Sequence, residues 1–136
     1  MTKEENFASI FGKGDSAPQD YFTGAAWIKT LVANDEVLTT VVSNVEFEPG
    51  ARNNWHTHPA GQILICTKGV GYYQEKGKEI QTLHPGDVIK IPPGLLHWHG
   101  ASPNESFAHI AINVNTEMGT ANWLARVTDE EYNQLK

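Results

Sequence analysis

The stretch GARNNWHTHPAGQ, residues 50–62, says most about how this chain folds and what chemistry it carries. In extended backbone, side chains two positions apart point the same way, so His56 and His58 share one face of a strand while Trp55 lies on the other. The Pro-Ala-Gly turn that follows can fold Gln62 back beside the two histidines. Three side chains able to bind a metal are therefore expected side by side.

A second stretch, PPGLLHWH at residues 92–99, repeats this arrangement, because His97 and His99 also lie two positions apart. Four of the six histidines thus form two same-face pairs, each after a turn containing Pro and Gly. Buried imidazoles need hydrogen-bond partners, and apolar side chains would fill a core more readily. Two such pairs in a short chain favour a metal site.

Short runs rich in β-branched and aromatic residues continue along the chain, separated by turns that contain Gly or Pro. This rhythm is typical of an antiparallel β-sandwich or barrel. One short helix is expected near the C-terminus, where Thr128 and Glu131 form a capping box, and it should run to about Leu135. The predicted strands span residues 27–31, 38–47, 62–67, 71–74, 79–83, 88–91, 97–100 and 107–113.

Size and charge narrow the classes of function. The 136 residues predict one domain over 21–136 after a loose arm over 1–20, and the single cysteine, Cys66, excludes an intrachain disulfide. The net charge of −6 comes without a basic stripe, so nucleic acid and anionic membranes are not expected partners. No apolar run approaches the ~20 residues of a membrane span, and no signal peptide is recognisable, so we expect a cytoplasmic protein.

Both histidine stretches match the two motifs of the cupin superfamily, G-x5-H-x-H-x3,4-E-x6-G and G-x5-P-x-G-x2-H-x3-N. The matching residues, all at the family spacing, are Gly50, His56, His58, Gln62 and Gly69 in the first motif and Gly86, Pro92, Gly94 and His97 in the second. The chain therefore resembles a cupin, which implies an antiparallel jelly-roll barrel. The resemblance also implies one divalent transition metal per chain, bound by His56, His58, Gln62 and His97.

Two positions depart from the motifs, because Gln62 replaces an acidic ligand and Ala101 replaces the final Asn. A metal bound by three neutral imidazoles and a neutral amide keeps its full double positive charge, which makes it a stronger Lewis acid. The alternative interpretation of Gln62 is a decayed site. An amide oxygen still binds divalent metals, and this donor set suits Mn²⁺, Fe²⁺, Ni²⁺ or Zn²⁺.

Nearly the whole chain is similar to a group of small single-domain bacterial cupins with a three-His, one-Gln site. The group includes manganese-dependent hydroxynitrile lyases and cupins associated with carboxymuconolactone decarboxylases. The similar segments are residues 21–24, 47–52, 55–59, 84–88, 97–101 and 127–132. This resemblance favours Mn²⁺, implies a homodimer or homotetramer, and places His99 and His109 in the active site, His109 as a base. Asn53 stands where those lyases carry a hydroxyl group.

Alternation along two strands suggests the rest of the pocket. His109 and Asn113 share a face of the strand at 107–113, and Ser43 and Val45 share a face of the strand at 38–47. With Asn53, we expect Ser43, Val45 and Asn113 to contact the substrate, although His99 and His109 could equally be structural. The opposite face of the 107–113 strand, with Ile110 and Ile112, packs either between two sheets or against a partner.

The favoured function is a metal-dependent lyase acting on a small molecule, which cleaves a C–C bond next to a hydroxyl or carbonyl group. In this hypothesis His109 removes the hydroxyl proton, and His99 or Asn53 orients the leaving group. Three alternatives stay open: another metal-dependent cupin enzyme such as a dioxygenase or isomerase, a non-enzymatic metal-dependent binding protein, and a vestigial scaffold.

Overall fold

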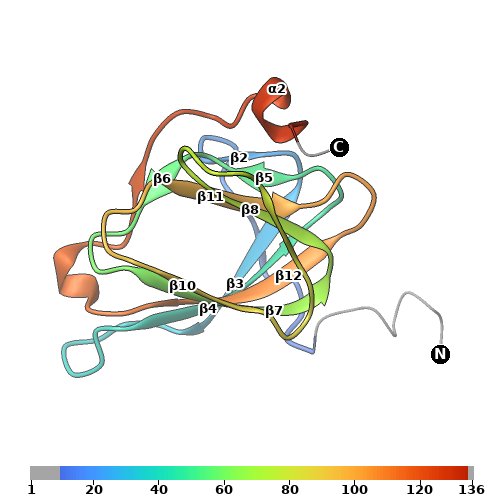
Figure 1. The fold of residues 1–136 in the computed structure, drawn as a ribbon. Helices are drawn as coiled ribbons and strands as arrows, with labels where there is room; N and C mark the ends of the chain where they lie inside the picture. The colour runs from blue at the N-terminus through green and yellow to red at the C-terminus, as the bar shows by residue number, and fades with distance from the viewer. Residues whose placement is uncertain (1–9, 135–136) are drawn as a thin grey trace.

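Two antiparallel sheets face each other and enclose the interior of a barrel (Figure 1). The computed structural model describes residues 10–134. In the first sheet, the strands lie in the order β1-β3-β4-β12-β7-β10. Their bounds are Asp15–Ser16 for β1, Ala26–Val32 for β3, Val41–Phe47 for β4, Phe107–Asn113 for β12, Gln62–Gly69 for β7 and Val88–Ile91 for β10.

In the second sheet, the strands lie in the order β13-β6-β11-β5-β2, and β8 pairs with both β11 and β9. Their bounds are Asn122–Trp123 for β13, His56–Thr57 for β6, His97–Ala101 for β11, Arg52–Asn53 for β5, Phe22–Thr23 for β2, Gly71–Glu75 for β8 and Gln81–Leu83 for β9. A 3₁₀ turn, η1 (Thr116–Met118), and a short helix, α2 (Asp129–Tyr132), complete the described fold. Helix α2 lies outside the second sheet (Figure 1).

Alternation along the strands separates the interior from the outer surface. On β7, Leu64 and Cys66 are buried in the main core, whereas Ile65 is 36% exposed. On β12, Ala111 belongs to the core while Ile110 and Ile112 are only partly buried and lie on the other face. The two isoleucines therefore do not pack between the sheets. At the end of β7, Gly69 has a φ of 72°, and a Cβ there would collide with the carbonyl oxygen of Ser106.

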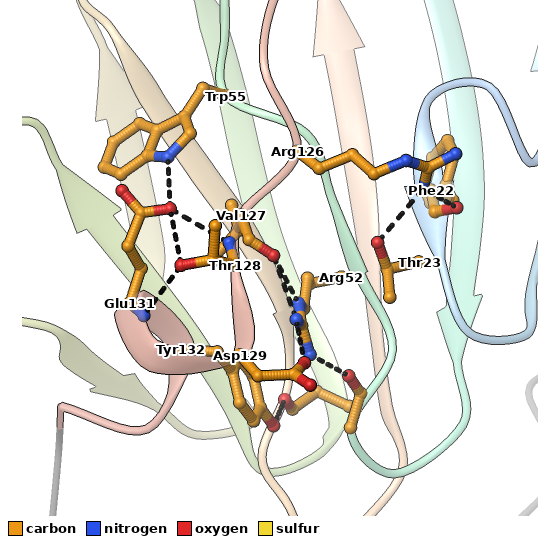
Figure 2. A network of polar contacts seen from close by, with 12 residues as sticks. Phe22, Thr23, Arg52, Trp55, Arg126, Val127, Thr128, Asp129, Glu131 and Tyr132 are labelled. Atoms are coloured by element: carbon orange, nitrogen blue, oxygen red, sulfur yellow. Dashed lines mark hydrogen bonds and ion pairs between the residues drawn. The ribbon is translucent and has the colours of Figure 1, made fainter.

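A second apolar cluster lies between α2 and the outer face of the second sheet and includes Trp55, Trp98 and Tyr132. Arg52 fastens the C-terminal segment to β5, because its Nε and Nη2 both donate to the carbonyl oxygen of Val127, at 3.3 and 2.9 Å (Figure 2). The hydroxyl group of Tyr132 donates to the carbonyl oxygen of Ala101 at 2.6 Å. These bonds hold the outer cluster beside the strand that carries Asn53.

The all-β antiparallel class and the C-terminal helix are confirmed, including the capping box of Thr128 and Glu131. The helix ends at Tyr132, and the predicted end at Leu135 lies outside the described residues. Within residues 10–134, no helix is long and apolar enough to cross a membrane.

Two strands begin two or three residues later than predicted, several other strand boundaries differ by one or two residues, and part of the arm also differs. The strand expected from residue 38 begins at Val41, because the Asp35 carboxylate accepts the backbone N–H groups of residues 37 and 38 and holds a turn there. The strand expected from residue 79 begins at Gln81. Within the arm expected over 1–20, β1 pairs with β3 and Ala17 is buried, whereas residues 1–9 lie outside the described part of the chain.

Candidate metal centre

Three histidine rings meet inside the barrel. Strand β6 pairs with β11 so that His56 lies opposite His97, which brings their ring centroids to 4.2 Å. His58, just beyond β6, has its ring centroid 4.8 Å from that of His56 and 5.3 Å from that of His97. All three side chains are buried. The two same-face pairs in the sequence are thus brought together by the pairing of two short strands.

Each ring is oriented through the same kind of hydrogen bond. The bonds join Nδ1 of His56 to the carbonyl oxygen of Asn54 (2.7 Å), Nδ1 of His58 to that of Thr120 (2.6 Å) and Nδ1 of His97 to that of Leu95 (2.9 Å). A carbonyl oxygen only accepts, so each Nδ1 carries the proton. Each Nε2 therefore keeps a free lone pair, as a metal ligand requires.

Several acceptor atoms in this cluster are buried without a partner in residues 10–134. They are Nε2 of His58, Nε2 of His97 and Oε1 of Gln62. Buried polar atoms are normally satisfied, so three unpaired acceptors close to one another need a donor or a cation. Imidazole nitrogen and amide oxygen suit a divalent transition metal. The residues present therefore fit the metal that the sequence motifs imply.

The protonation of the rings agrees with this fit. Burial lowers the pKa of His56 well below its ordinary value, and it lowers the pKa of His97 to about 4. The pKa of His58 is also lowered, again chiefly by burial. The rings are thus neutral at neutral pH, which is the form that binds a metal.

His99 joins the same cluster from β11. The ligand atoms of His56, His97 and His99 lie within 4.8 Å of one another, and this three-histidine group could hold a metal ion. His99 differs from the other rings, because its Nδ1 lies 3.1 Å from Nε2 of His109 and not against a backbone carbonyl. The four-ligand set of His56, His58, Gln62 and His97 stays a prediction, supported by the unpaired acceptors.

His99, His109 and Asn53 form a buried polar group beside the three rings. Oδ1 of Asn53 accepts the backbone N–H of His99 at 2.9 Å, which turns its Nδ2 toward the His99 ring, 3.2 Å from Nδ1. His109 reaches the same ring from β12, in the opposite sheet. Burial lowers the pKa of His109 to about 3, so this ring is neutral at neutral pH and keeps one nitrogen lone pair.

A cavity of about 180 Å³ opens beside these groups. The predicted site residues that line it are Ser43, Val45, Asn53, His56, His58, Gln62, His99, His109 and Asn113. His97 is not among the lining residues but lies buried against His56. The structure therefore gathers the residues predicted to bind metal, proton and substrate in one place.

Sequence reasoning missed most of the remaining wall, although it placed Ala111 on the same strand face as His109 and Asn113. Phe22, Ile28, Ala111, Thr120, Ala121 and Trp123 also line the cavity. Trp123 lies over the histidine cluster, and its ring centroid is 4.6 Å from that of His56. Tyr21 stacks on Trp123, with their ring centroids 4.8 Å apart. No local pattern in the sequence marks Trp123.

A two-sheet antiparallel barrel defines the class of small jelly-roll proteins, and the histidine cluster in its interior could hold a metal ion. The chain belongs to the cupin family, whose sequence profile matches residues 14–134. It is 44% identical over 121 residues to the (R)-mandelonitrile lyase of Granulicella tundricola. The matched residues cover 89% of this chain and 90% of that protein.

Two further comparisons extend this result. The crystal structure of a cupin-like protein from Thermotoga maritima superimposes with a TM-score of 0.89 and 51% identity, covering 91% of this chain and 94% of that one. A germin-like protein of Arabidopsis thaliana, subfamily 1 member 4, is 36% identical over 66 residues, which amount to 43% of this chain and 30% of that protein.

Proposed function

We propose that the protein is a metal-dependent lyase that cleaves the C–C bond between a hydroxyl-bearing carbon and a nitrile. The observation that carries the proposal is one cavity lined both by three of the four predicted metal ligands and by the hydrogen-bonded pair His99 and His109. The similarity to (R)-mandelonitrile lyase, which extends over most of both chains, supports this choice of reaction.

His56, His58 and His97 would hold the metal through Nε2, and Gln62 through Oε1. When bound, a divalent metal, with Mn²⁺ as first choice, supplies positive charge that stabilises negative charge on a substrate oxygen. These four predicted ligands come from both sheets. His56 and His97 lie on the second sheet and His58 lies just beyond its strand β6, whereas Gln62 lies on the first sheet.

The pair His99 and His109 accepts the hydroxyl proton of the substrate. The bond to the nitrile carbon then breaks, its electron pair leaves with cyanide, and the C–O bond becomes a carbonyl. Burial keeps His109 neutral before the reaction, and an anion beside the ring favours its charged form. The proton finally passes to cyanide, so that hydrogen cyanide and an aldehyde or ketone leave and the imidazoles return to their starting state.

Other residues position these groups and the substrate. Asn53 contacts the His99 backbone N–H with Oδ1 and its ring with Nδ2, so it fixes the orientation of His99. Ser43 and Val45 line the cavity from β4 and are the proposed substrate contacts on that wall. Trp123 and Phe22 give the cavity apolar wall, which would keep water from the metal end and strengthen electrostatic interactions there.

The direct test is release of benzaldehyde from mandelonitrile, followed by absorbance, with protein stripped of metal and then reloaded with Mn²⁺. We expect release to disappear on stripping and to return on reloading. The double variant His56→Ala, His58→Ala should neither retain metal nor release benzaldehyde. Equal rates with stripped and reloaded protein would contradict the metal dependence. Absence of release from fully metallated protein would contradict the lyase reaction.

A further inference from the structure

Gln62 and Asn113 are direct neighbours across two strands of the first sheet. Residue 62 opens β7 and residue 113 ends β12, and the two are paired in the register of these strands. Both side chains point to the interior, because both line the cavity. Directly opposed residues on one face of an antiparallel pair lie close enough for their side chains to interact.

One hydrogen bond joins the two amides. Nε2 of Gln62 donates to Oδ1 of Asn113 at 3.1 Å. The opposite end of the Gln62 amide, Oε1, is buried outside hydrogen-bond geometry in the described part of the chain, and the Gln62 side chain interacts with that of His58. Gln62 is buried, with only 6% of its surface exposed. The bond to Asn113 therefore determines which end of a buried amide faces the histidine cluster.

The two ends of an amide differ in what they can do at a metal. The carbonyl oxygen has lone pairs and binds divalent cations, whereas the NH₂ group is a donor without a ligand lone pair. A reversed Gln62 would direct N–H groups toward the imidazole Nε2 atoms, which are acceptors. The reversed side chain would thus occupy the lone pairs that the metal needs and would withdraw its own oxygen.

We propose that Asn113 is a positioning residue for the metal centre: its side-chain oxygen holds the Gln62 amide with Oε1 toward the three imidazoles. This role is distinct from the substrate contact predicted for Asn113 from the sequence. It rests on the metal site within the proposed function and not on the lyase reaction. Outer partners of metal ligands typically change metal affinity by about 10- to 100-fold when removed.

The test measures metal affinity without substrate, by calorimetric titration of metal-free protein with Mn²⁺ and with Zn²⁺. Zn²⁺ is included because imidazole sites bind it more tightly than Mn²⁺, which keeps weak variants measurable. Asn113→Leu removes the acceptor at similar volume and should weaken binding about 10- to 100-fold. Asn122→Leu is the matched control, because Asn122 is exposed and does not line the cavity, and its affinity should stay within about twofold of wild type.

A double-mutant cycle shows whether Asn113 acts through Gln62. In a Gln62→Leu background, Asn113→Leu should change the affinity by less than about threefold, because the amide that Asn113 orients is gone. Asn113→Asp keeps an acceptor at the same place and adds negative charge, so it should bind metal at least as tightly as wild type.

Two results would overturn the positioning role of Asn113. One is a wild-type metal affinity in Asn113→Leu. The other is that Asn113→Leu lowers the metal affinity as much in the Gln62→Leu background as it does in the wild-type protein. Circular dichroism confirms folding, and Asn113→Ala replaces the Leu variant if that one fails to fold. Metal binding without benzaldehyde release would refute the lyase reaction and leave the role of Asn113 standing. Benzaldehyde release with normal metal affinity in Asn113→Leu would refute the role of Asn113 alone. A wild-type protein that binds neither metal would refute both.

Discussion

At the scale of single residues, the local backbone orients two of the predicted metal ligands. The Nδ1 of His56 donates to the carbonyl oxygen of Asn54, and the Nδ1 of His97 donates to that of Leu95, in each case two residues earlier in the chain. The backbone around each histidine thus fixes both ring orientation and tautomer. His58 depends instead on Thr120, which is distant in sequence, so its orientation is a property of the complete fold.

His109 gives the sharpest catalytic prediction. His109→Ala should lower benzaldehyde release by about 10²- to 10⁴-fold, since proton transfer by a positioned side chain contributes on this scale. Metal content, measured by atomic emission on the same preparation, should stay at one ion per chain because His109 is not among the predicted ligands. A variant that keeps the full rate would show that His109 is not part of the proton acceptor.

The lowered pKa of His109 also predicts that the free energy of unfolding of the metal-free protein depends on pH. Its pKa is about 3 in the fold, against about 6.5 for an unfolded histidine, so the unfolded chain binds more protons between these values. This contribution to stability is complete above pH 6.5 and is lost as the pH falls toward 3. The adjacent His99 contributes with the same sign, whereas Cys66 on the paired strand stays neutral because its pKa is raised to about 11.

Urea unfolding between pH 7 and 4.5 isolates the part of this effect that belongs to His109. His109→Gln should reduce the slope of the unfolding free energy with pH by up to about 1.4 kcal/mol per pH unit, the value for one proton. Both proteins are compared without metal, and the difference in slopes is unaffected by any uniform loss of stability. Identical slopes would mean that His109 is not buried in its neutral form.

At the scale of elements, strands with a continuous local pattern were predictable from the sequence. The bounds of β10 and β12 agree with the prediction, because their alternation is bordered by turns that contain Gly or Pro. The short strand β1 was missed, since Asp15 and Ser16 have low strand propensity and pair only because β3 lies alongside. The turn held by the Asp35 carboxylate was missed because the apolar residues 37 and 38 resemble the start of a strand.

The candidate site shows the same division between local and distant information. The histidines were found because their spacing in the chain reproduces a motif, and alternation located Ser43 and Asn113. Trp123 reaches the cluster only because β13 pairs with β6 and places Trp123 opposite His56. A pairing of two-residue strands leaves no periodic signal in the sequence, so this part of the wall required the structure.

The C-terminal element yields a stability prediction at Arg52, whose contacts are drawn in Figure 2. Arg52→Met should lower the free energy of unfolding by about 2–3 kcal/mol, because it leaves the carbonyl oxygen of Val127 without its charged donor. Asp129→Asn should have an effect below about 0.5 kcal/mol, because the Asp129 side chain is 89% exposed and surface ion pairs contribute little. Equal losses in the two variants would show that the ion pair, and not the carbonyl contact, fastens α2.

At the scale of the whole molecule, the candidate metal centre draws its residues from both sheets. Gln62 belongs to the first sheet and His97 to the second, and each carries a buried acceptor atom without a hydrogen-bond partner among the described residues. Without a cation, these buried acceptors lower stability, because each has given up its hydrogen bonds with water. A bound metal would satisfy them together and link opposite sides of the barrel, so binding and global stability should be coupled.

The coupling has a calculable size. A ligand that binds only the folded state, present at a hundred times its dissociation constant, raises the free energy of unfolding by about 2.7 kcal/mol. For a domain of this length, that increase corresponds to a rise in Tm of roughly 10 °C. We therefore expect Mn²⁺ to raise the Tm of metal-free protein by this amount in calorimetry, and EDTA to reverse it. The double variant His56→Ala, His58→Ala should show no rise, because half of the predicted ligands are gone. A rise of the same size in that variant would place the stabilising ion elsewhere on the molecule, and the link between the sheets would have to be abandoned.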